Sequence, residues 1–233
     1  MGRPARSWCV AYVVVAMMLA AIPGAAFGAV TMTHDLNWGS NGWGEGQFSY
    51  PSDVTTDKWG NVYVAGGESG DDRVQMFTAD GVFLKSVGVS EVSPPVVMPR
   101  TVATDRWGTI YVGEKGAVTN ATVRMYNPLL YSESGVFQES PLDEIQGPVN
   151  LAVALDGTVY LSERGSFVQR WRRQSFMDAW SALGTATMGM GVTQDGVVLT
   201  TTDLSLGILH SVIAYDADGV YLDDWGGQGT ENG

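Results

Sequence analysis

The sequence predicts an all-β fold built from one repeated unit of short strands. Each unit has a proline-led apolar run, a glycine turn and a second apolar run, as in Pro51–Val64. A third apolar run that ends in an aromatic residue follows, as in Val74–Phe77. The units begin at Pro51, Pro99, Pro148 and near Thr187, which are 48, 49 and 39 residues apart. Four short strands that recur at this spacing are typical of the blades of a β-propeller.

The first two strands of each unit are expected to form a hairpin. Proline suits the first residue of a strand, because its missing N–H costs no ladder bond there. Asp156–Gly157 and Asp195–Gly196 predict type I′ turns, in which both central residues have positive φ. Trp59–Gly60 and Trp107–Gly108 occupy the same positions in the first two units.

The third and fourth strands complete each unit. The third strands are predicted at Val74–Phe77, Val123–Tyr126, Val168–Trp171 and Val212–Tyr215. The fourth are predicted at Gly81–Leu84, Gly135–Phe137 and Gly219–Leu222, and in degenerate form at Ala179–Leu183. Tyrosines recur at one position (Tyr63, Tyr111, Tyr160), and so do the terminal aromatics Phe77, Tyr126, Trp171 and Tyr215. This regularity predicts packing between blades rather than a platform for carbohydrate.

The first unit, Pro51–Gly88, resembles the NHL repeat, whose pattern includes Gly-Asn-Val-Tyr-Val and Arg-Val-Gln-x-Phe. The second unit, Pro99–Tyr126, also matches well. The third matches in part, since Ala154 stands where the first two have Asp57 and Asp105, and the fourth lacks both the proline and the aspartate. The resemblance implies a β-propeller, usually a ring of six blades. NHL propellers have many different functions, so the resemblance implies no single one, and some NHL-like propellers are metal-dependent lyases.

The order of the segments follows from this repeat. We expect a signal peptide (1–28), a closing strand and lead-in loop (29–50), blades at 51–88, 99–145, 148–185 and 187–226, and a lead-in to a further blade (227–233). Leu36–Trp38 is the expected closing strand. A four-bladed ring complete in itself is the alternative. An open last blade would offer an edge for self-association.

The N-terminus reads as an export signal. Arg3 and Arg6 precede the uncharged run 8–22, and Ala26–Gly28 offers a small-residue cleavage site. We therefore expect a secreted or extracytoplasmic protein with no membrane span after cleavage; an uncleaved membrane anchor is the alternative. Cys9 is the only cysteine and lies in this segment, so disulfides do not staple the mature domain.

The chain is acidic. It has 13 Lys+Arg against 25 Asp+Glu, and loss of Arg3 and Arg6 would leave 11 against 25, a net charge of −14. Such a surface repels phosphate backbones, so nucleic acid is not an expected partner. Cationic ligands, divalent ions and basic partners remain compatible with it, although acidity also serves solubility alone.

In a propeller, the loops between second and third strands and those between blades gather on one face. Gly66, Glu114, Glu163 and Thr202 occupy one position before these loops. The candidate ligand-binding residues on this face are Glu68, Asp71, Asp72, Glu114, Glu163, Arg164 and Asp203. Glu114 and Glu163 are candidate Ca²⁺ ligands in the channel. Alternatively, each carboxylate caps its own loop backbone.

The sequence contains no nucleophile elbow, phosphate-binding loop or zinc-binding helix motif. Its two histidines, His34 and His210, exclude a three-histidine zinc site in this chain. We therefore expect a binding or scaffold module for a protein, peptide or glycan, without a cofactor. Trp43, Trp59 and Trp107 are candidate partner contacts, and Asn120 begins a glycosylation sequon. The alternative is a lyase or lactonase with a divalent ion in the channel.

Overall fold

The computed structural model describes residues 37–66, 72–87, 96–114, 122–127, 133–137, 148–163, 167–182, 187–202 and 211–226. The chain divides into two units, Met1–Asn37 and Trp38–Gly233. Of the first unit only Asn37 is described, and it is exposed. All strands belong to the second unit, and in the described ranges they are the only regular secondary structure, which confirms the all-β class.

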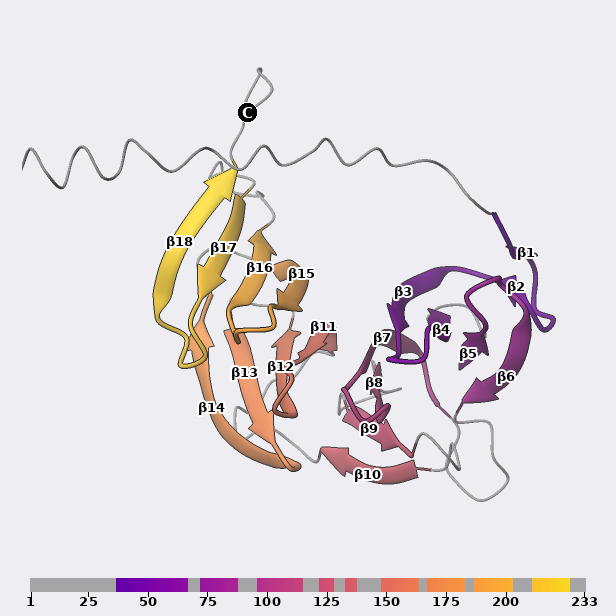
Figure 1. Ribbon diagram of the computed structural model, residues 1–233, viewed down its shortest axis with the longest axis horizontal. Helices are drawn as coiled ribbons and strands as arrows, with labels where there is room; N and C mark the ends of the chain where they lie inside the picture. Colours follow the sequence, from indigo (N-terminus) through magenta and orange to yellow (C-terminus); the bar gives the residue numbers. More distant parts are fainter. Residues whose placement is uncertain are drawn as a thin grey trace, which may run out of the picture. The chain divides into compact units, whose positions relative to one another are not determined.

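Four antiparallel sheets, which we number 1 to 4, follow one another along the chain, and each has its strands in chain order (Figure 1). Sheet 1 consists of β3 (Pro51–Thr56), β4 (Val62–Gly66), β5 (Arg73–Phe77) and β6 (Phe83–Val87). Sheet 2 consists of β7 (Pro99–Thr104), β8 (Ile110–Glu114), β9 (Thr122–Tyr126) and β10 (Glu133–Phe137). Sheet 3 consists of β11 (Pro148–Val153), β12 (Thr158–Glu163), β13 (Phe167–Arg172) and β14 (Ser175–Ser181). Sheet 4 consists of β15 (Thr187–Val192), β16 (Val198–Thr202), β17 (Ser211–Tyr215) and β18 (Tyr221–Gly226). Before them, β1 (Ser40–Asn41) pairs in parallel with β2 (Gln47–Phe48).

The hairpin turns between first and second strands share one geometry, which differs from the predicted type I′. In sheet 1 the amide of Gly60 donates to the carbonyl of Asp57 over 3.1 Å, and the amide of Asp57 donates to the carbonyl of Asn61 over 3.0 Å. The equivalent bonds recur in turns 105–108, 154–157 and 193–196. Only the glycine has positive φ, so each loop is a type I turn followed by one left-handed residue. The type I′ prediction is wrong because a three-residue loop needs a single left-handed position.

A two-residue turn with positive φ at both positions does occur, at Arg173–Gln174 between β13 and β14. These φ angles are 51° and 64°. Nothing in the side chains of arginine and glutamine signals this turn. The fourth strand of sheet 3 therefore begins at Ser175, and the predicted Ala179–Leu183 placed it too late.

The hydrophobic core of the described residues lies between neighbouring sheets. Three buried clusters occur, one at each junction between consecutive sheets. Since side chains alternate along a strand, one strand serves two clusters: in β8, Ile110 and Val112 face sheet 1, whereas Tyr111 faces sheet 3. Both faces of such strands are buried, which explains their continuous apolar sequence. The predicted packing of the repeated tyrosines between sheets is confirmed.

Trp38 packs against sheet 1 as Trp180 of β14 packs against sheet 4. Its ring centroid lies 4.7 Å from that of Phe77, and a Cβ placed on Gly81 would lie 2.6 Å from its Cδ1 atom. Trp180 lies equally close over Gly219. Of the expected closing strand Leu36–Trp38, Leu36 lies outside the described residues and Trp38 belongs to no strand.

The last strand, β18, is exposed along its whole length. Trp225 pairs with Val212 as Trp180 pairs with Val168, yet Trp225 is 48% exposed. Tyr221 and Leu222 are similarly exposed. Self-association through this edge stays a prediction.

Candidate functional site

The register of the sheets defines two distinct ends. The last residues of the second strands, Gly66, Glu114, Glu163 and Thr202, pair with the first residues of the first strands. Connections from second to third strands and from sheet to sheet therefore leave from this end, which we name the loop end. The hairpin turns 57–60, 105–108, 154–157 and 193–196 lie at the opposite end, which we name the turn end.

The two ends differ in how strictly the repeat is kept. At the turn end, the four hairpins share the same backbone hydrogen bonds. At the loop end, the segments from second to third strand range from three residues (164–166) to eight (203–210). The turns from third to fourth strand also lie at the turn end, and they vary from two residues (173–174) to six (127–132), so the strict repeat holds for the hairpins between first and second strands. Variable loops on a constant frame are the usual arrangement of a binding surface.

Most predicted site residues fall in these loops. Glu68, Asp71, Arg164, Asp203, Asn120 and both histidines lie outside the described residues. Glu163 ends β12, where its backbone pairs with Pro148. Asp72 is exposed and accepts a hydrogen bond from the amide of Met98 over 2.9 Å. This bond joins the residue before β5 to the residue before β7, the first strand of sheet 2.

Glu114 is the predicted site residue that the structure describes best. It is 2% exposed, and its carboxylate pairs with the guanidinium of Arg124 on the neighbouring strand β9, with Nε and Oε2 2.9 Å apart. It also accepts from the amide of Val97 over 3.3 Å. These contacts hold the segment before β7, in the connection from sheet 1 to sheet 2, and capping of the loop that follows Glu114 stays a prediction. No group of three potential metal ligands occurs in the described part of the chain.

Glu114→Gln should lower the free energy of unfolding by about 3 kcal/mol, because it removes the buried negative charge that pairs with the guanidinium of Arg124. Urea denaturation followed by intrinsic fluorescence measures the change. Asp156→Asn is the matched control, since Asp156 pairs with Arg172 at 3.3 Å but both side chains are about half exposed. That variant should change stability by less than about 1 kcal/mol. Equal effects would contradict a structural role for the buried pair.

The first strands line a cavity of about 280 Å³. Residues of β3, β7, β11 and β15 contribute to it. Asp53 accepts from the hydroxyl of Thr101 over 2.7 Å and from the amide of Val102 over 2.9 Å. The carboxylate is thus used to join sheet 1 to sheet 2.

At the turn end, a carboxylate anchors the hairpin in each of the first two sheets. Asp57 accepts from the amides of Trp59 and Asn61, both over 2.9 Å, and from the buried hydroxyl of Tyr63 over 3.0 Å. Asp105 repeats this pattern in sheet 2, where it accepts from the hydroxyl of Tyr111 over 3.2 Å. Burial and the charge of Asp105 raise the pKa of Tyr111, so the phenol remains a donor.

Two of the tryptophans named as candidate partner contacts lie at this end, and both are exposed. Trp59 and Trp107 are 57% and 48% exposed. The ammonium group of Lys58 lies 4.4 Å from the Trp59 ring centroid, and the guanidinium of Arg106 lies 4.4 Å from that of Trp107. Trp43, in the lead-in segment, is 55% exposed.

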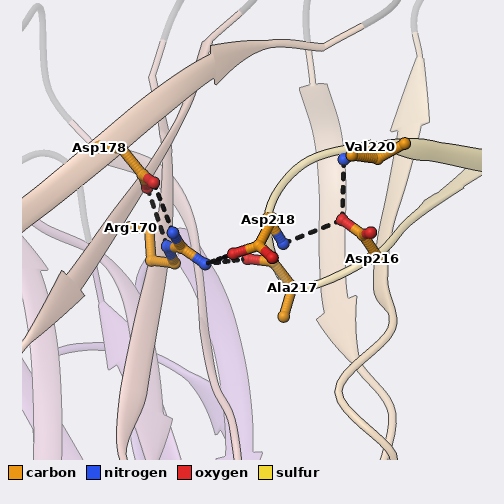
Figure 2. Close-up of polar contacts among 6 residues, drawn as sticks. All are labelled: Arg170, Asp178, Asp216, Ala217, Asp218 and Val220. Atoms are coloured by element: carbon orange, nitrogen blue, oxygen red, sulfur yellow. Dashed lines mark hydrogen bonds and ion pairs between the residues drawn. The ribbon is translucent and has the colours of Figure 1, made fainter.

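Sheet 3 carries a polar cluster that sequence reasoning missed (Figure 2). Arg170 pairs with Asp178 across the sheet through two bonds, of 2.8 Å and 2.5 Å. It reaches sheet 4 through Asp218, 2.7 Å away, and through the carbonyl of Ala217. The hydrogen bonds to Asp178, opposed in part by burial, raise the pKa of Arg170, so it stays charged. The sequence held one signal for this cluster: an arginine stands at position 170, whereas methionines (Met76 and Met125) occupy the same register position in sheets 1 and 2.

Similarity to solved structures agrees with this architecture. Hydrazine synthase of Kuenenia stuttgartiensis aligns with a TM-score of 0.60 at 15% identity, over 75% of this chain and 48% of that one. The structure of U3-55K gives 0.59 at 11% identity, over 76% and 52%. The RRP9 WD40 repeats give 0.58 at 10% identity, over 74% and 50%. At these identities the similarity shows the fold alone, a β-propeller, and the chain spans about half the length of these structures.

No protein-family model matches the sequence, and no curated protein matches it. The part of the chain that the structure describes has no helix with the length and apolar character of a membrane span.

Proposed function

We propose that this chain is an exported, NHL-type β-propeller module that binds a protein, peptide or glycan partner at its loop end. The observation that carries the proposal is the contrast between the hairpins that join first and second strands and the loop-end segments that join second and third strands. Turn-end hairpins repeat the same hydrogen bonds, whereas loop-end segments vary from three to eight residues. A rigid frame with variable loops at one end suits recognition. The net charge of −12 disfavours nucleic acid as the partner.

Site-specific photo-crosslinking in the full chain tests the location. Tyr50 lies immediately before β3 at the loop end and is 67% exposed, whereas Trp59 lies at the turn end and is 57% exposed. A benzoylphenylalanine at either position replaces one exposed aromatic by another. We expect partner adducts from position 50 and not from position 59 when the protein is expressed in its own cell. Adducts from position 59 alone would contradict the proposal, because they would place the partner at the turn end.

Export is tested on the full chain expressed in its own cell. Cleavage after Gly28 gives Ala29 as the new N-terminus of the exported protein, which N-terminal sequencing detects. A mature protein that keeps Met1 would favour the membrane-anchor alternative.

A propeller enzyme with a divalent ion in the channel is the second candidate function. A cation bound only by the folded state would raise the melting temperature by mass action. Titration with Ca²⁺ or Zn²⁺ to millimolar concentration therefore separates the two candidates. We expect no shift; a clear shift would favour the lyase or lactonase alternative. A ring of six blades also stays a prediction.

A further inference from the structure

Sheet 3 departs from the repeat at two positions that lie together. Tyr63, Tyr111 and Tyr160 occupy equivalent positions, and the first two donate their hydroxyls to Asp57 and Asp105, six residues earlier. In sheet 3 the residue six positions before the tyrosine is Ala154. Tyr160 has therefore lost the acceptor that its counterparts use.

The hydroxyl of Tyr160 gains no replacement partner among the residues that the structure describes. The residue is 2% exposed, and its ring packs edge-on against Trp180 at 6.0 Å. Burial raises the pKa of this phenol, although the charge of Arg170 lowers it in part, so the hydroxyl is neutral. The hydroxyl oxygen is not itself a buried unsatisfied atom, so the small exposed part of this residue includes a donor that is open to a ligand.

Tyr160 lies in the wall of a groove. Ala154 and Tyr160 both line a groove of about 500 Å³ at the turn end between sheets 3 and 4. This volume lies within the roughly 300–1,000 Å³ of small-molecule sites. The counterpart hydroxyls bond to residues 57 and 105, and the equivalent residue in sheet 3, Ala154, lines the same groove as Tyr160.

The charges around the groove select the class of ligand. Its walls carry three carboxylates, from Asp156, Asp195 and Asp218, and two guanidiniums, from Arg170 and Arg172. Arg170 is already paired with Asp178 and Asp218, and Arg172 with Asp156. An anion would meet the carboxylates, and a cation would meet the guanidiniums. A neutral ligand with alternating donors and acceptors fits this lining best.

We propose that this groove binds a neutral, hydroxyl-rich ligand, a saccharide unit, and that Tyr160 supplies a hydrogen bond from its wall. The polar lining includes donors and acceptors side by side, and Met177 and Leu155 add apolar contact for the faces of a sugar ring. Specificity in such sites comes from a few placed polar groups. The site lies at the end opposite the proposed partner surface and does not depend on it.

Ligand-observed saturation-transfer NMR on the full chain tests the proposal. The probes are the methyl glycosides of glucose, galactose and mannose, and N-acetylglucosamine, each at about 10 mM to detect millimolar affinity. We expect at least one to bind. Tyr160→Phe should weaken that binding about tenfold while leaving stability unchanged, because the hydroxyl has no protein partner to lose. Ala154→Asp should abolish binding, because the carboxylate takes the hydroxyl and fills the space, and should leave the fold intact.

Tyr111→Phe is the matched control. It removes the same atom in sheet 2, where the hydroxyl is bonded to Asp105, so it should lower stability and leave sugar binding unchanged. Absence of binding by all four sugars would overturn the proposal, as would binding that survives both Tyr160→Phe and Ala154→Asp. Methyl phosphate and methylammonium, whose methyl protons the same experiment observes, serve as charged probes. Binding of either that depends on Tyr160 would overturn the assigned ligand class.

Discussion

Gly219→Ala should lower the free energy of unfolding by about 3 kcal/mol, which combines left-handed strain with overpacking. Gly219 has a φ of +80°, and a Cβ there would lie 2.6 Å from Cγ of Trp180. The indole cannot simply retreat, since it packs against Tyr160 at 6.0 Å and Tyr215 at 6.2 Å. Chemical denaturation monitored by circular dichroism measures the loss.

Gly196→Ala separates the two causes. Gly196 has a φ of +89° in an equivalent left-handed position, but an added Cβ would meet no atom within 4 Å. Its cost should be the backbone strain alone, about 1 kcal/mol. If the two variants lost the same stability, the close packing of Trp180 over the turn of sheet 4 would be disproved.

Asp57→Ala should cost about 3 kcal/mol, because one buried carboxylate satisfies several donors and hydrogen bonds to charged groups are the strong ones. Its Oδ1 atom holds the hairpin amides, and its Oδ2 atom accepts from Asn61 Nδ2 over 2.8 Å and from the hydroxyl of Tyr63 over 3.0 Å. The variant leaves that hydroxyl buried without an acceptor. Thermal and urea unfolding provide the measurement.

Asp216→Ala is the control for the turn contribution. The carboxylate of Asp216 accepts from the amides of Asp218 and Val220 over 2.9 Å and 2.8 Å (Figure 2). These exposed bonds resemble a helix cap, and their loss should cost about 1 kcal/mol. A loss as large as that of Asp57→Ala would mean that the turn amides, and not the buried hydroxyl, carry the effect.

Local sequence patterns were sufficient to predict the frame. Prolines, apolar runs and turn glycines recur at fixed spacing, so the all-β class, the strand order and the packing of the repeated aromatics followed from them. The turn type did not follow, because Asp-Gly suits several turns and the length of the loop decides among them. Arg173–Gln174 shows the converse, a left-handed turn imposed by the strands that flank it.

The site was harder to predict because its contacts join distant residues. Arg170 meets Asp218, 48 residues later, and no local pattern announces such a pair. The absence of an aspartate at Ala154 was visible in the sequence, but its consequence for Tyr160 depends on where that hydroxyl points. Glu114 was placed at the right repeat position, yet its use as a partner of Arg124 required the neighbouring strand.

The most direct test of binding at the loop end replaces segments 67–71, 115–121, 164–166 and 203–210 of the full chain with glycine-serine segments of equal length. The yield of adducts from a crosslinker at Tyr50 and the urea midpoint are then measured together. We expect the adducts to disappear while the midpoint stays close to that of the unchanged chain, since the frame lies in the sheets. Adducts that persist at full yield would contradict binding through these loops.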